Sequence, residues 1–500
     1  LVGHMVNPVP GEFVEVEGPW ITHPKFGNQL KVVQYKTLVP ATSFGIQKYL
    51  GSGLIKGIGP VMAKRIVKKF GVKSLEIIES HTQRLSEIDG IGKKRIQMIQ
   101  TAWEEQKEIR SVMLFLQSHG VSTAYAAKIF KTYGQDAIAN VKENPYRLAR
   151  DIFGIGFITA DGIAEKLGID KQAPQRIEAG LEYVLHQLSD DGHVCYPYTP
   201  LCEKIQEMLD VEYDLVLTAV SDAFRQERIV IEDAGVDIDA LQENDKLVFL
   251  KKFHVCEIGI TQNLKRIKNG GTAIRKIDTQ RAVEWVKGQI PFTLAQKQQD
   301  AVAAAIEQKT MVITGGPGTG KTTIINAIIK ILKKAGAKIL LAAPTGRAAK
   351  RMNEATWEKA STIHRMLDYS MKQMGFKKNS KNRLKCDVLI IDEASMIDTV
   401  LMHHLLKAVP SSATLILVGD VNQLPSVGPG NVLNDIIHSH AVSVVELDTI
   451  FRQAKKSLIV VNAHRINQGK FPVVVNEKKR SNFFFVQKEE PQEVLSTIID

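Results

Sequence analysis

The strongest chemical signal in this sequence is a glycine-rich segment between a short apolar run and a helical pattern. The segment reads Gly-Gly-Pro-Gly-Thr-Gly-Lys-Thr over residues 315–322. Strand, glycine loop and helix in this order are the context of a loop that binds phosphate through backbone N–H groups. We predict ATP and Mg²⁺ as cofactors, with Lys321 at the β and γ oxygens and Thr322 on the metal. The expected cofactor-binding residues are Gly316, Pro317, Gly318, Thr319, Gly320, Lys321, Thr322 and Thr323.

Two acids end another strongly apolar run, residues 388–391. A carboxylate at such a strand end can hold the water shell of Mg²⁺, which makes Asp392 a second candidate for the metal and the cofactor. The adjacent Glu393 can orient and deprotonate an attacking water. Acids after an apolar run are also typical of a solvated strand end. Because these acids follow a phosphate-binding loop in the chain, the catalytic interpretation is favoured.

Two further apolar runs end in polar segments. Residues 414–418 lead to Gln423, an uncharged side chain that could hydrogen-bond the γ-phosphate and report its loss on hydrolysis. Residues 338–342 lead to Pro344 and Thr345. Small and hydroxyl side chains there permit a nucleic-acid backbone to approach closely, so both residues are candidates for nucleic-acid contact.

A short glycine signal recurs in the N-terminal half of the chain. Gly57 and Gly59, Gly90 and Gly92, and Gly154-Ile155-Gly156 each stand before a helical pattern, and His119-Gly120-Val121 is a related turn. Such glycines allow a tight turn and close approach to a ligand, and the following helix offers its N–H groups to a phosphate. The repeats resemble helix-hairpin-helix units that bind the DNA backbone. The first two carry lysines (Lys56, Lys64, Lys93 and Lys94), whereas the third could only pack; a helical bundle with glycine-rich turns is the alternative.

The chain is too long for a single core, so we expect a multidomain α/β protein. The pattern predicts a partial, OB-like β unit over 1–43 and tandem helix-hairpin-helix repeats over 44–170. A winged-helix-like or linker module is expected over 171–270. A RecA-like parallel α/β domain is expected over 271–440, and a second, incomplete one over 441–500.

Composition excludes some classes of protein. Lys and Arg number 65 against 54 Asp and Glu, which gives a net charge of +11 and suits a polyanionic partner. The four scattered cysteines contain no Cys-x-x-Cys pair for zinc, and no apolar run is long enough for a membrane span. Scattered cysteines of this kind are typical of reduced thiols in a cytoplasmic protein. The start of the chain has no basic stretch followed by an apolar core, so it is not a signal peptide. It also lacks an initial Met, and we expect the chain to begin inside a longer protein.

The ordered set of motifs resembles superfamily 1 helicases and, among them, the RecD-like DNA helicases of bacteria. By motif the resemblance covers residues 290–500, and with the hairpin repeats it covers nearly the whole chain. It implies ATP-driven 5′ to 3′ movement on single-stranded DNA, unwinding of duplex DNA, and a role in repair or recombination. It also implies that Gln298 contacts adenine, that Gln423 couples hydrolysis to movement, and that Arg452 is an arginine finger. Thr345, Thr362 and His364 match segments that line the single-strand track in this family.

Residues 369–385 resemble the short β-hairpin pin with which this family splits a duplex. We expect the Lys/Asn-rich residues 377–382 to form its turn, although charged insertions are often only solvated loops. The family's remaining motifs, including a second catalytic arginine, are not found before the sequence stops at Asp500. A strand over 482–486 and a helix over 491–500 are expected to open the second motor domain. The chain should then be a fragment that hydrolyses ATP poorly by itself.

Two other functions compete with a helicase. An ATP-switched nucleic-acid binding module would use the same ATPase without unwinding. A P-loop phosphotransferase would have no use for the hairpin repeats or for the segment after residue 418. RNA as the polymer is not excluded by the motor motifs.

Overall fold

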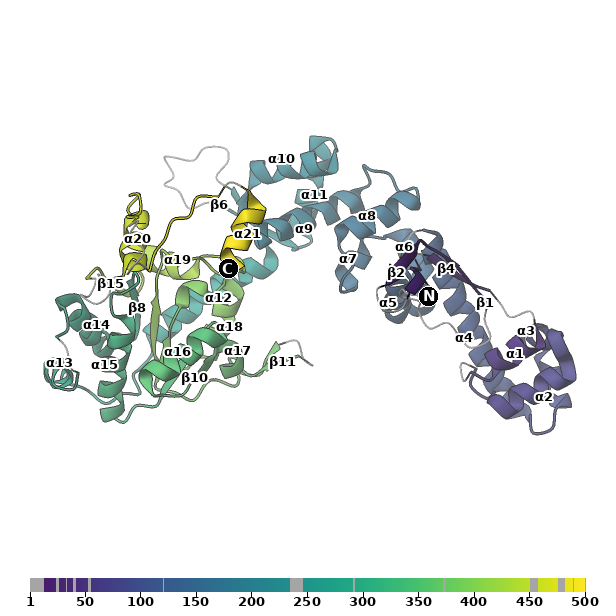
Figure 1. Ribbon diagram of the computed structural model, residues 1–500, viewed down its shortest axis with the longest axis horizontal. Helices are drawn as coiled ribbons and strands as arrows, with labels where there is room; N and C mark the ends of the chain where they lie inside the picture. The colour runs from purple at the N-terminus through teal and green to yellow at the C-terminus, as the bar shows by residue number, and fades with distance from the viewer. Residues whose placement is uncertain are drawn as a thin grey trace. The chain divides into compact units, whose positions relative to one another are not determined.

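A computed structural model describes residues 13–23, 27–32, 34–38, 42–52, 55–119, 121–233, 246–290, 293–371, 375–449, 457–474, 482–488 and 490–499. The chain forms two compact units (Figure 1). The first comprises Leu1–Leu181 with Ile205–Ala219, and the second comprises Glu182–Lys204 with Val220–Asp500.

The N-terminal residues form the short strands that their alternating pattern predicts. Strand β1 (Phe13–Glu17) pairs antiparallel with β4 (Gln34–Leu38). Strand β2 (Trp20–His23) pairs in the same way with β3 (Gly27–Leu30). The described part of this β unit is therefore two separate two-stranded ribbons.

The helical region that follows has two cores rather than one. Ile46, Ile66, Ile96 and their neighbours form the first core, and Val112, Ile129, Ile163 and theirs form the second. The long helix α4 supplies residues to both, which fits two tandem helix-hairpin-helix pairs. The helices are α1 (Ser43–Leu50), α2 (Pro60–Phe70), α3 (Ser74–Ser80), α4 (Lys93–Ser118), α5 (Thr123–Tyr133), α6 (Ala137–Glu143), α7 (Arg147–Asp151) and α8 (Phe157–Lys166).

The next segment contains the ribbon expected of a winged-helix-like module. Three antiparallel strands in the order β5-β7-β6 form a sheet within the second unit. In the chain, two helices precede two strands, as the sequence pattern predicts, but a further helix and a short strand come before them. The elements are α9 (Pro174–Asp190), β5 (Cys195–Pro197), α10 (Tyr198–Leu209), α11 (Tyr213–Arg225), β6 (Ile229–Asp233) and β7 (Lys246–Leu250).

The second unit is built on a parallel sheet of six strands in the order β10-β9-β13-β14-β8-β15. Strands β8, β13 and β14 are buried along their whole length, as apolar strands covered on both faces must be. This confirms the RecA-like parallel α/β domain. The strands are β8 (Thr310–Gly315), β9 (Ile339–Ala343), β10 (Ala360–Thr362), β13 (Val388–Ile391), β14 (Thr414–Gly419) and β15 (Ser443–Leu447).

Alternate residues of these strands face two different cores, because successive side chains of a strand point to opposite faces. Met311 and Ile313 pack with helices α13 (Thr279–Lys287), α14 (Gln296–Glu307) and α15 (Lys321–Lys334). Val312 packs instead with helices of the other face. These are α12 (Lys251–Lys268), α17 (Ile363–Met366), α18 (Thr399–Ala408) and α19 (Val432–His438).

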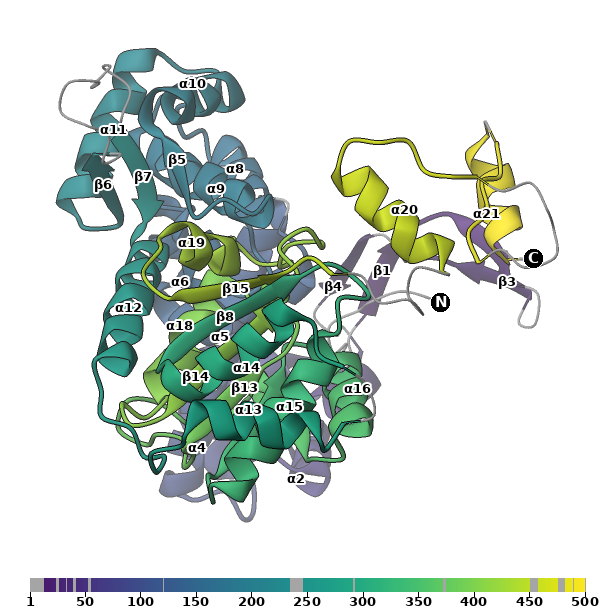
Figure 2. The same ribbon diagram turned by 90° about the vertical axis from the view of Figure 1, so that its left-hand side faces the viewer.

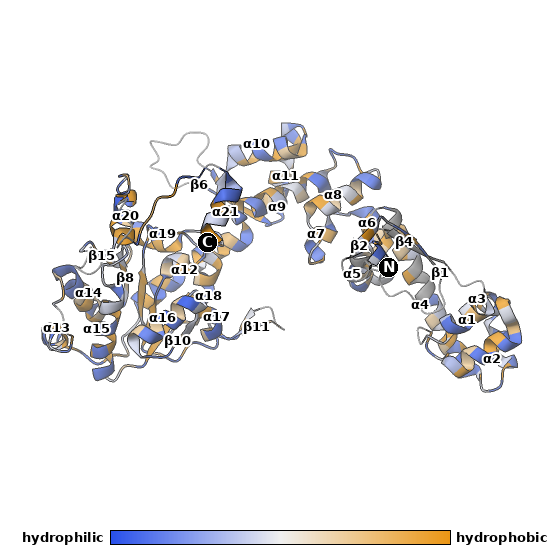
Figure 3. Ribbon diagram, viewed as in Figure 1, coloured by the Kyte–Doolittle hydropathy of each residue, from blue (hydrophilic) through white to orange (hydrophobic). Residues whose placement is uncertain are grey.

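Figures 1 and 2 show α13, α14 and α15 together on one side of the sheet. In Figure 3 the same helices carry both hydrophilic and hydrophobic colours, as expected of helices with one face on a core. The sheet thus positions the carboxyl ends of its parallel strands and the N-termini of the helices that follow them, and a site can form between these ends.

The structure moves both expected boundaries of the ATPase domain. Helix α12 lies in its core through Ile260 and Ile267, and Arg266 donates to the backbone oxygens of Leu406 and Val409 in and just after α18. The domain therefore begins before residue 271. Strand β15 pairs with β8, so residues 443–447 complete this sheet instead of opening a second one, and the boundary at 440 is wrong.

The C-terminal residues contain two helices, α20 (Leu458–Asn467) and α21 (Pro491–Ile499). The strand expected over 482–486 is not formed. A strand needs a neighbour with which to exchange backbone hydrogen bonds, and no described segment pairs with these residues. No described helix is long and apolar enough to cross a membrane.

Candidate nucleotide site and nucleic-acid interface

The phosphate-binding loop joins buried β8 to helix α15, as its sequence predicts. Gly318 and Gly320 have φ angles of 77° and 85°, in the left-handed region that favours glycine. Gly316 is required for a different reason, since a Cβ atom there would lie 2.5 Å from a ring carbon of His464. The loop therefore wraps in front of the first turn of α15, where helix N–H groups favour an anion.

The loop is held in shape by its own polar side chains. The Thr319 hydroxyl donates to the Gly316 carbonyl at 2.9 Å. The Lys321 ammonium donates to the carbonyls of Gly315 and Gly316. Burial lowers the pKa of Lys321, and the nearby carboxylates of Asp420, Glu393 and Asp392 act in the opposite direction. A partly buried cation thus faces three acids at the edge of the sheet.

Those acids converge because β13 and β14 are parallel neighbours. Asp392 follows β13 and Asp420 follows β14, so both lie at the carboxyl edge next to the loop. Asp392 is buried, and its burial raises the pKa of its carboxyl group. The sequence interpretation did not include Asp420. Its signal was present in the acid that directly follows the apolar run of β14.

These residues fit a nucleoside triphosphate with a divalent cation. Lys321 and the loop N–H groups can hold phosphate oxygens, and Asp392 and the exposed Thr322 offer the oxygen ligands that Mg²⁺ prefers. Among the described residues, Glu393 Oε2 and Ser395 Oγ are buried with no hydrogen-bond partner. Buried polar atoms are normally satisfied, so these two indicate chemistry that the protein by itself does not complete.

Glutamines 423 and 298 occupy different places in the site. The Gln423 amide donates to Asp420 Oδ2 at 3.2 Å, which holds it at the acidic edge. Gln298 is buried behind the loop, where its amide donates to the Thr319 carbonyl at 3.0 Å and its Oε1 accepts from the Ala295 N–H at 3.1 Å. Both ends of the Gln298 side chain thus bond to the backbone, and in this structure Gln298 stabilises the loop.

The predicted arginine finger, Arg452, lies outside the described residues.

A histidine that the sequence interpretation missed reaches the loop from α20. His464 Nε2 donates to the Pro317 carbonyl at 3.1 Å. Nothing in the local sequence around residue 464 signals this contact, because it depends on where α20 packs. The contact joins the segment after β15 to the phosphate-binding loop.

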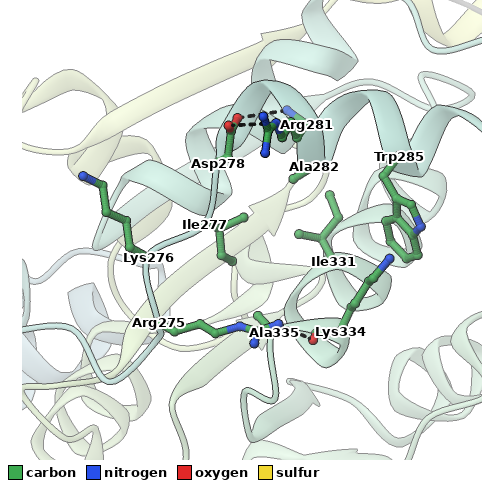
Figure 4. Close-up of a pocket in the computed structure, with 10 residues that line it drawn as sticks. All are labelled: Arg275, Lys276, Ile277, Asp278, Arg281, Ala282, Trp285, Ile331, Lys334 and Ala335. Atoms are coloured by element: carbon green, nitrogen blue, oxygen red, sulfur yellow. Dashed lines mark hydrogen bonds and ion pairs between the residues drawn. The ribbon is translucent and has the colours of Figure 1, made fainter.

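A cavity of about 440 Å³ in the same unit is not the nucleotide site (Figure 4). It lies between the segment around Arg275, helix α13 and the C-terminal end of α15, where the Lys334 ammonium sits 4.1 Å from the centre of the Trp285 ring. The phosphate-binding loop precedes the other end of α15. At about 1.5 Å per residue, the helix separates the two places by roughly 20 Å.

The residues expected on a single-strand track lie at the ends of two neighbouring strands. Pro344 and Thr345 follow β9, and Thr362 ends β10, which pairs with β9 in parallel. Thr345 and Thr362 use their hydroxyls as N-caps of α16 (Gly346–Thr356) and α17. His364 is exposed and packs against Phe376 with ring centres 5.6 Å apart. All four candidates therefore share one edge of the sheet.

The expected β-hairpin exists, but its position differs from the prediction. Strand β11 (Tyr369–Ser370) pairs with β12 (Gly375–Phe376), and the rings of Tyr369 and Phe376 lie 5.2 Å apart. The Lys/Asn segment 377–382 follows the second strand and forms a turn of its own, closed by bonds between Asn379 and Asn382. The prediction that it forms the hairpin turn is wrong. The aromatic cross-strand pair sets the register instead of the polar turn residues.

The three glycine hairpins of the first unit share one backbone geometry. Gly57, Gly90 and Gly154 have φ angles of 100°, 92° and 95°. In each hairpin the isoleucine between the glycines is buried and bonds back to the isoleucine three residues earlier. A Cβ atom added at Gly59 or Gly92 would meet no other atom within 4 Å, so the backbone at these two glycines is open to a ligand. Lys56, Lys64, Lys93 and Lys94 are all exposed beside them.

Taken together, the fold is that of a P-loop α/β domain in one chain with helix-hairpin-helix repeats. Family models match the chain accordingly. They are an "AAA domain" over residues 298–429, an "ATP-dependent RecD2 DNA helicase HHH domain" over 105–195, an "ATP-dependent DNA helicase YrrC, OB-fold domain" over 1–40, and a "SAM-like Helix-hairpin-helix tandem" over 53–105.

The chain is similar in sequence to the RecD2 helicases and to the RecD subunits of RecBCD enzymes. It is 30% identical to the ATP-dependent RecD2 DNA helicase of Deinococcus radiodurans over 90% of its own length and 62% of that protein's. It is 34% identical to the RecBCD enzyme subunit RecD of Mycolicibacterium smegmatis over 41% of each chain. The chain thus spans less than two thirds of these relatives. A crystal structure of Pif1 helicase from Candida albicans is 26% identical over 32% of this chain and 41% of that one, with a TM-score of 0.26.

Proposed function

We propose that this protein is the ATP-hydrolysing and DNA-binding part of a DNA helicase that moves 5′ to 3′ along single-stranded DNA. The observation that carries the proposal is the edge of the sheet where Lys321 faces Asp392, Glu393 and Asp420. A partly buried lysine among three acids at a glycine loop suits a triphosphate and its metal ion. The helix-hairpin-helix repeats with their exposed lysines support DNA as the polymer that the same chain binds.

In this proposal each residue at the edge has its own task. The loop N–H groups and Lys321 bind the phosphates, and Glu393 accepts a proton from the attacking water. Gln423, held by Asp420, senses the γ-phosphate, and Arg452 acts as an arginine finger. A bound Mg²⁺ would neutralise phosphate charge, with Thr322 and Asp392 holding it. Lys321→Ala should abolish hydrolysis, and continued turnover in that variant would place the nucleotide elsewhere.

DNA would be bound at two kinds of surface. The hairpins around Gly57 and Gly90 would hold the sugar-phosphate backbone without reading sequence, since their exposed groups are N–H donors and lysines. The strand ends at Pro344, Thr345, Thr362 and His364 would form part of the single-strand track. Comparing stimulation of ATP hydrolysis by DNA and by RNA homopolymers of equal length would decide which polymer the motor uses.

The direction of movement and a role in DNA repair rest on kinship with RecD-like helicases. Strand displacement should be measured on duplexes with a 5′ tail and with a 3′ tail, using the full-length protein. We expect unwinding of the 5′-tailed substrate alone. Unwinding of the 3′-tailed substrate alone would refute the polarity but leave helicase activity in place.

The competing possibility, an ATP-switched binding module, is distinguished at the β11–β12 hairpin. Lys377 N already bonds to the Asp368 carbonyl at 3.2 Å, so residues 369–376 can be replaced by Asn-Gly without opening the base. If the hairpin is the pin, this variant should lose unwinding and retain DNA-stimulated hydrolysis. Changing Lys377, Lys378 and Lys381 to Ala is the matched control and should leave unwinding intact. Absence of unwinding in the unaltered full-length protein would favour the binding module.

A further inference from the structure

The proposed general base is not free in this structure. Glu393 directly follows β13 with a left-handed φ of 53°, and its side chain is 12% exposed. One carboxylate oxygen, Oε1, is ion-paired with the guanidinium of Arg351, and Oε2 is buried with no described hydrogen-bond partner. The carboxylate that should meet the attacking water is therefore held by a single cation.

That cation comes from a neighbouring element and can be reached from solvent. Arg351 lies on α16, which follows β9, the strand next to β13 in the sheet. Its side chain is 66% exposed, against 12% for its partner. A solute can thus compete for the arginine but not for the glutamate. The charge of Arg351 is also felt inside the site, where it lowers the pKa of Lys321 and of Asp392, although burial dominates both shifts.

Arg351 belongs to a cationic face of α16. Arg347, Lys350 and Arg351 are exposed at positions three and four residues apart, so they share one side of the helix. The N-cap of the same helix is Thr345, where a DNA strand is expected to pass. A phosphodiester backbone that followed this face would meet Arg351 and could pair with it bidentately, as arginine pairs with phosphate.

We propose that Arg351 is a positioning residue that restrains Glu393 until a nucleic-acid phosphate on α16 takes its guanidinium. Released Glu393 then accepts one proton from a water, while the water oxygen bonds to the γ-phosphorus and the bond to the bridging oxygen of ADP breaks. The inference rests on the proposed function and adds the link by which DNA would turn on hydrolysis.

The test compares steady-state ATP hydrolysis with and without oligo(dT) for the full-length protein and its variants. Arg351→Ala should raise kcat without DNA and leave KM for ATP little changed. The ratio of DNA-stimulated to basal rate should fall by at least about 5-fold, the lower end of typical coupling between two sites. Arg351→Lys should restore part of the ratio, because a lysine can still pair with Glu393.

The matched control is Arg347→Ala, which removes a cation of the same face that has no described contact with Glu393. It should raise the DNA concentration needed for half-maximal stimulation and preserve the maximal ratio. The double variant Arg351→Ala with Glu393→Gln should be as inactive as Glu393→Gln alone. Unchanged thermal unfolding of Arg351→Ala would show that its effect is not a loss of fold.

An unchanged or lower basal rate in Arg351→Ala would overturn the proposal, because the arginine would then restrain nothing. If DNA still stimulates the wild-type protein, an unchanged basal rate in Arg351→Ala would contradict the restraint but not the proposed function. A wild-type protein without DNA stimulation, or a Lys321→Ala variant that still hydrolyses ATP, would instead remove the proposed function and the restraint together.

Discussion

The phosphate-binding loop of the second unit and the glycine hairpins of the first use the same backbone device. In both, a glycine with a φ angle between 77° and 100° turns the chain just before a helix, so that N–H groups are presented to an anion. They differ in what surrounds the turn. The loop follows a fully buried strand and meets a partly buried lysine and three acids, whereas the first two hairpins stand beside exposed lysines.

This difference suits the loop to catalysis and the basic hairpins to binding. Desolvated charges at one place act strongly on each other and on a reacting group, because little water screens them. Exposed lysines repeated along a surface each contribute a similar, salt-dependent increment to binding. We expect the third hairpin to contribute less to DNA binding than the first two. It has the same geometry, but Phe153 and Ile158 are 93% and 69% exposed beside its glycines.

The largest expected effect is that of Lys321→Ala. Loss of the ammonium that faces three carboxylates should reduce hydrolysis by at least about 10²–10³-fold, the scale for removing one transition-state donor. Phosphate release in the presence of DNA measures it. DNA affinity without ATP, measured by fluorescence anisotropy, should be unchanged; a large loss of affinity would mean that loop and hairpins do not act separately.

Glu393→Gln should separate binding from chemistry within the loop region itself. Without a general base, hydrolysis should fall by about 10²–10⁴-fold, while a fluorescent ATP analogue should still bind, since Lys321 and the loop remain. Loss of nucleotide binding in this variant would argue that Glu393 holds the cofactor instead of activating water.

Replacing Lys56, Lys64, Lys93 and Lys94 with Ala should change DNA binding and not hydrolysis chemistry. The plot of log binding constant against log salt should become shallower by about 0.9 for each lost contact with duplex phosphate, so by at most about 3.6. A matched control replaces the exposed Lys73, Lys131, Lys166 and Lys171, which lie away from the two basic hairpins. Equal effects of the two sets would show that only net charge matters.

The smallest effects should distinguish the two glycines of one hairpin. Gly90 has a φ of 92°, so Gly90→Ala should destabilise the first helix pair by about 1–2 kcal/mol. Gly92 lacks a positive φ and has open space around it, so Gly92→Ala should leave stability nearly unchanged and weaken DNA binding. Hydrogen exchange in α2 and α4 should be about 5- to 30-fold faster in the first variant only. Equal hydrogen-exchange rates in the Gly90→Ala and Gly92→Ala variants would contradict strain at Gly90.

Much of the fold was predictable because its signals are local. The loop at 315–322, the apolar strands and the hairpin glycines depend on residues close together in the chain, and their order was enough to indicate the similarity to RecD-like helicases. The hairpin turn, the strand at 482–486 and the domain boundaries were mispredicted. Each depends on pairing or packing with residues far away, as β15 depends on β8 and α12 on α18.

The sequence alone determined which segments turn, which strands are buried and which residue types stand at their ends, since backbone freedom and hydrophobic periodicity act over a few residues. Only the tertiary structure decided which of those ends meet. The parallel order of β9, β13, β14 and β8 places Asp420 beside Asp392 and Lys321, and the position of α16 gives Glu393 its partner Arg351. Contacts of this kind arise from strand order and helix packing, which no short stretch of sequence contains.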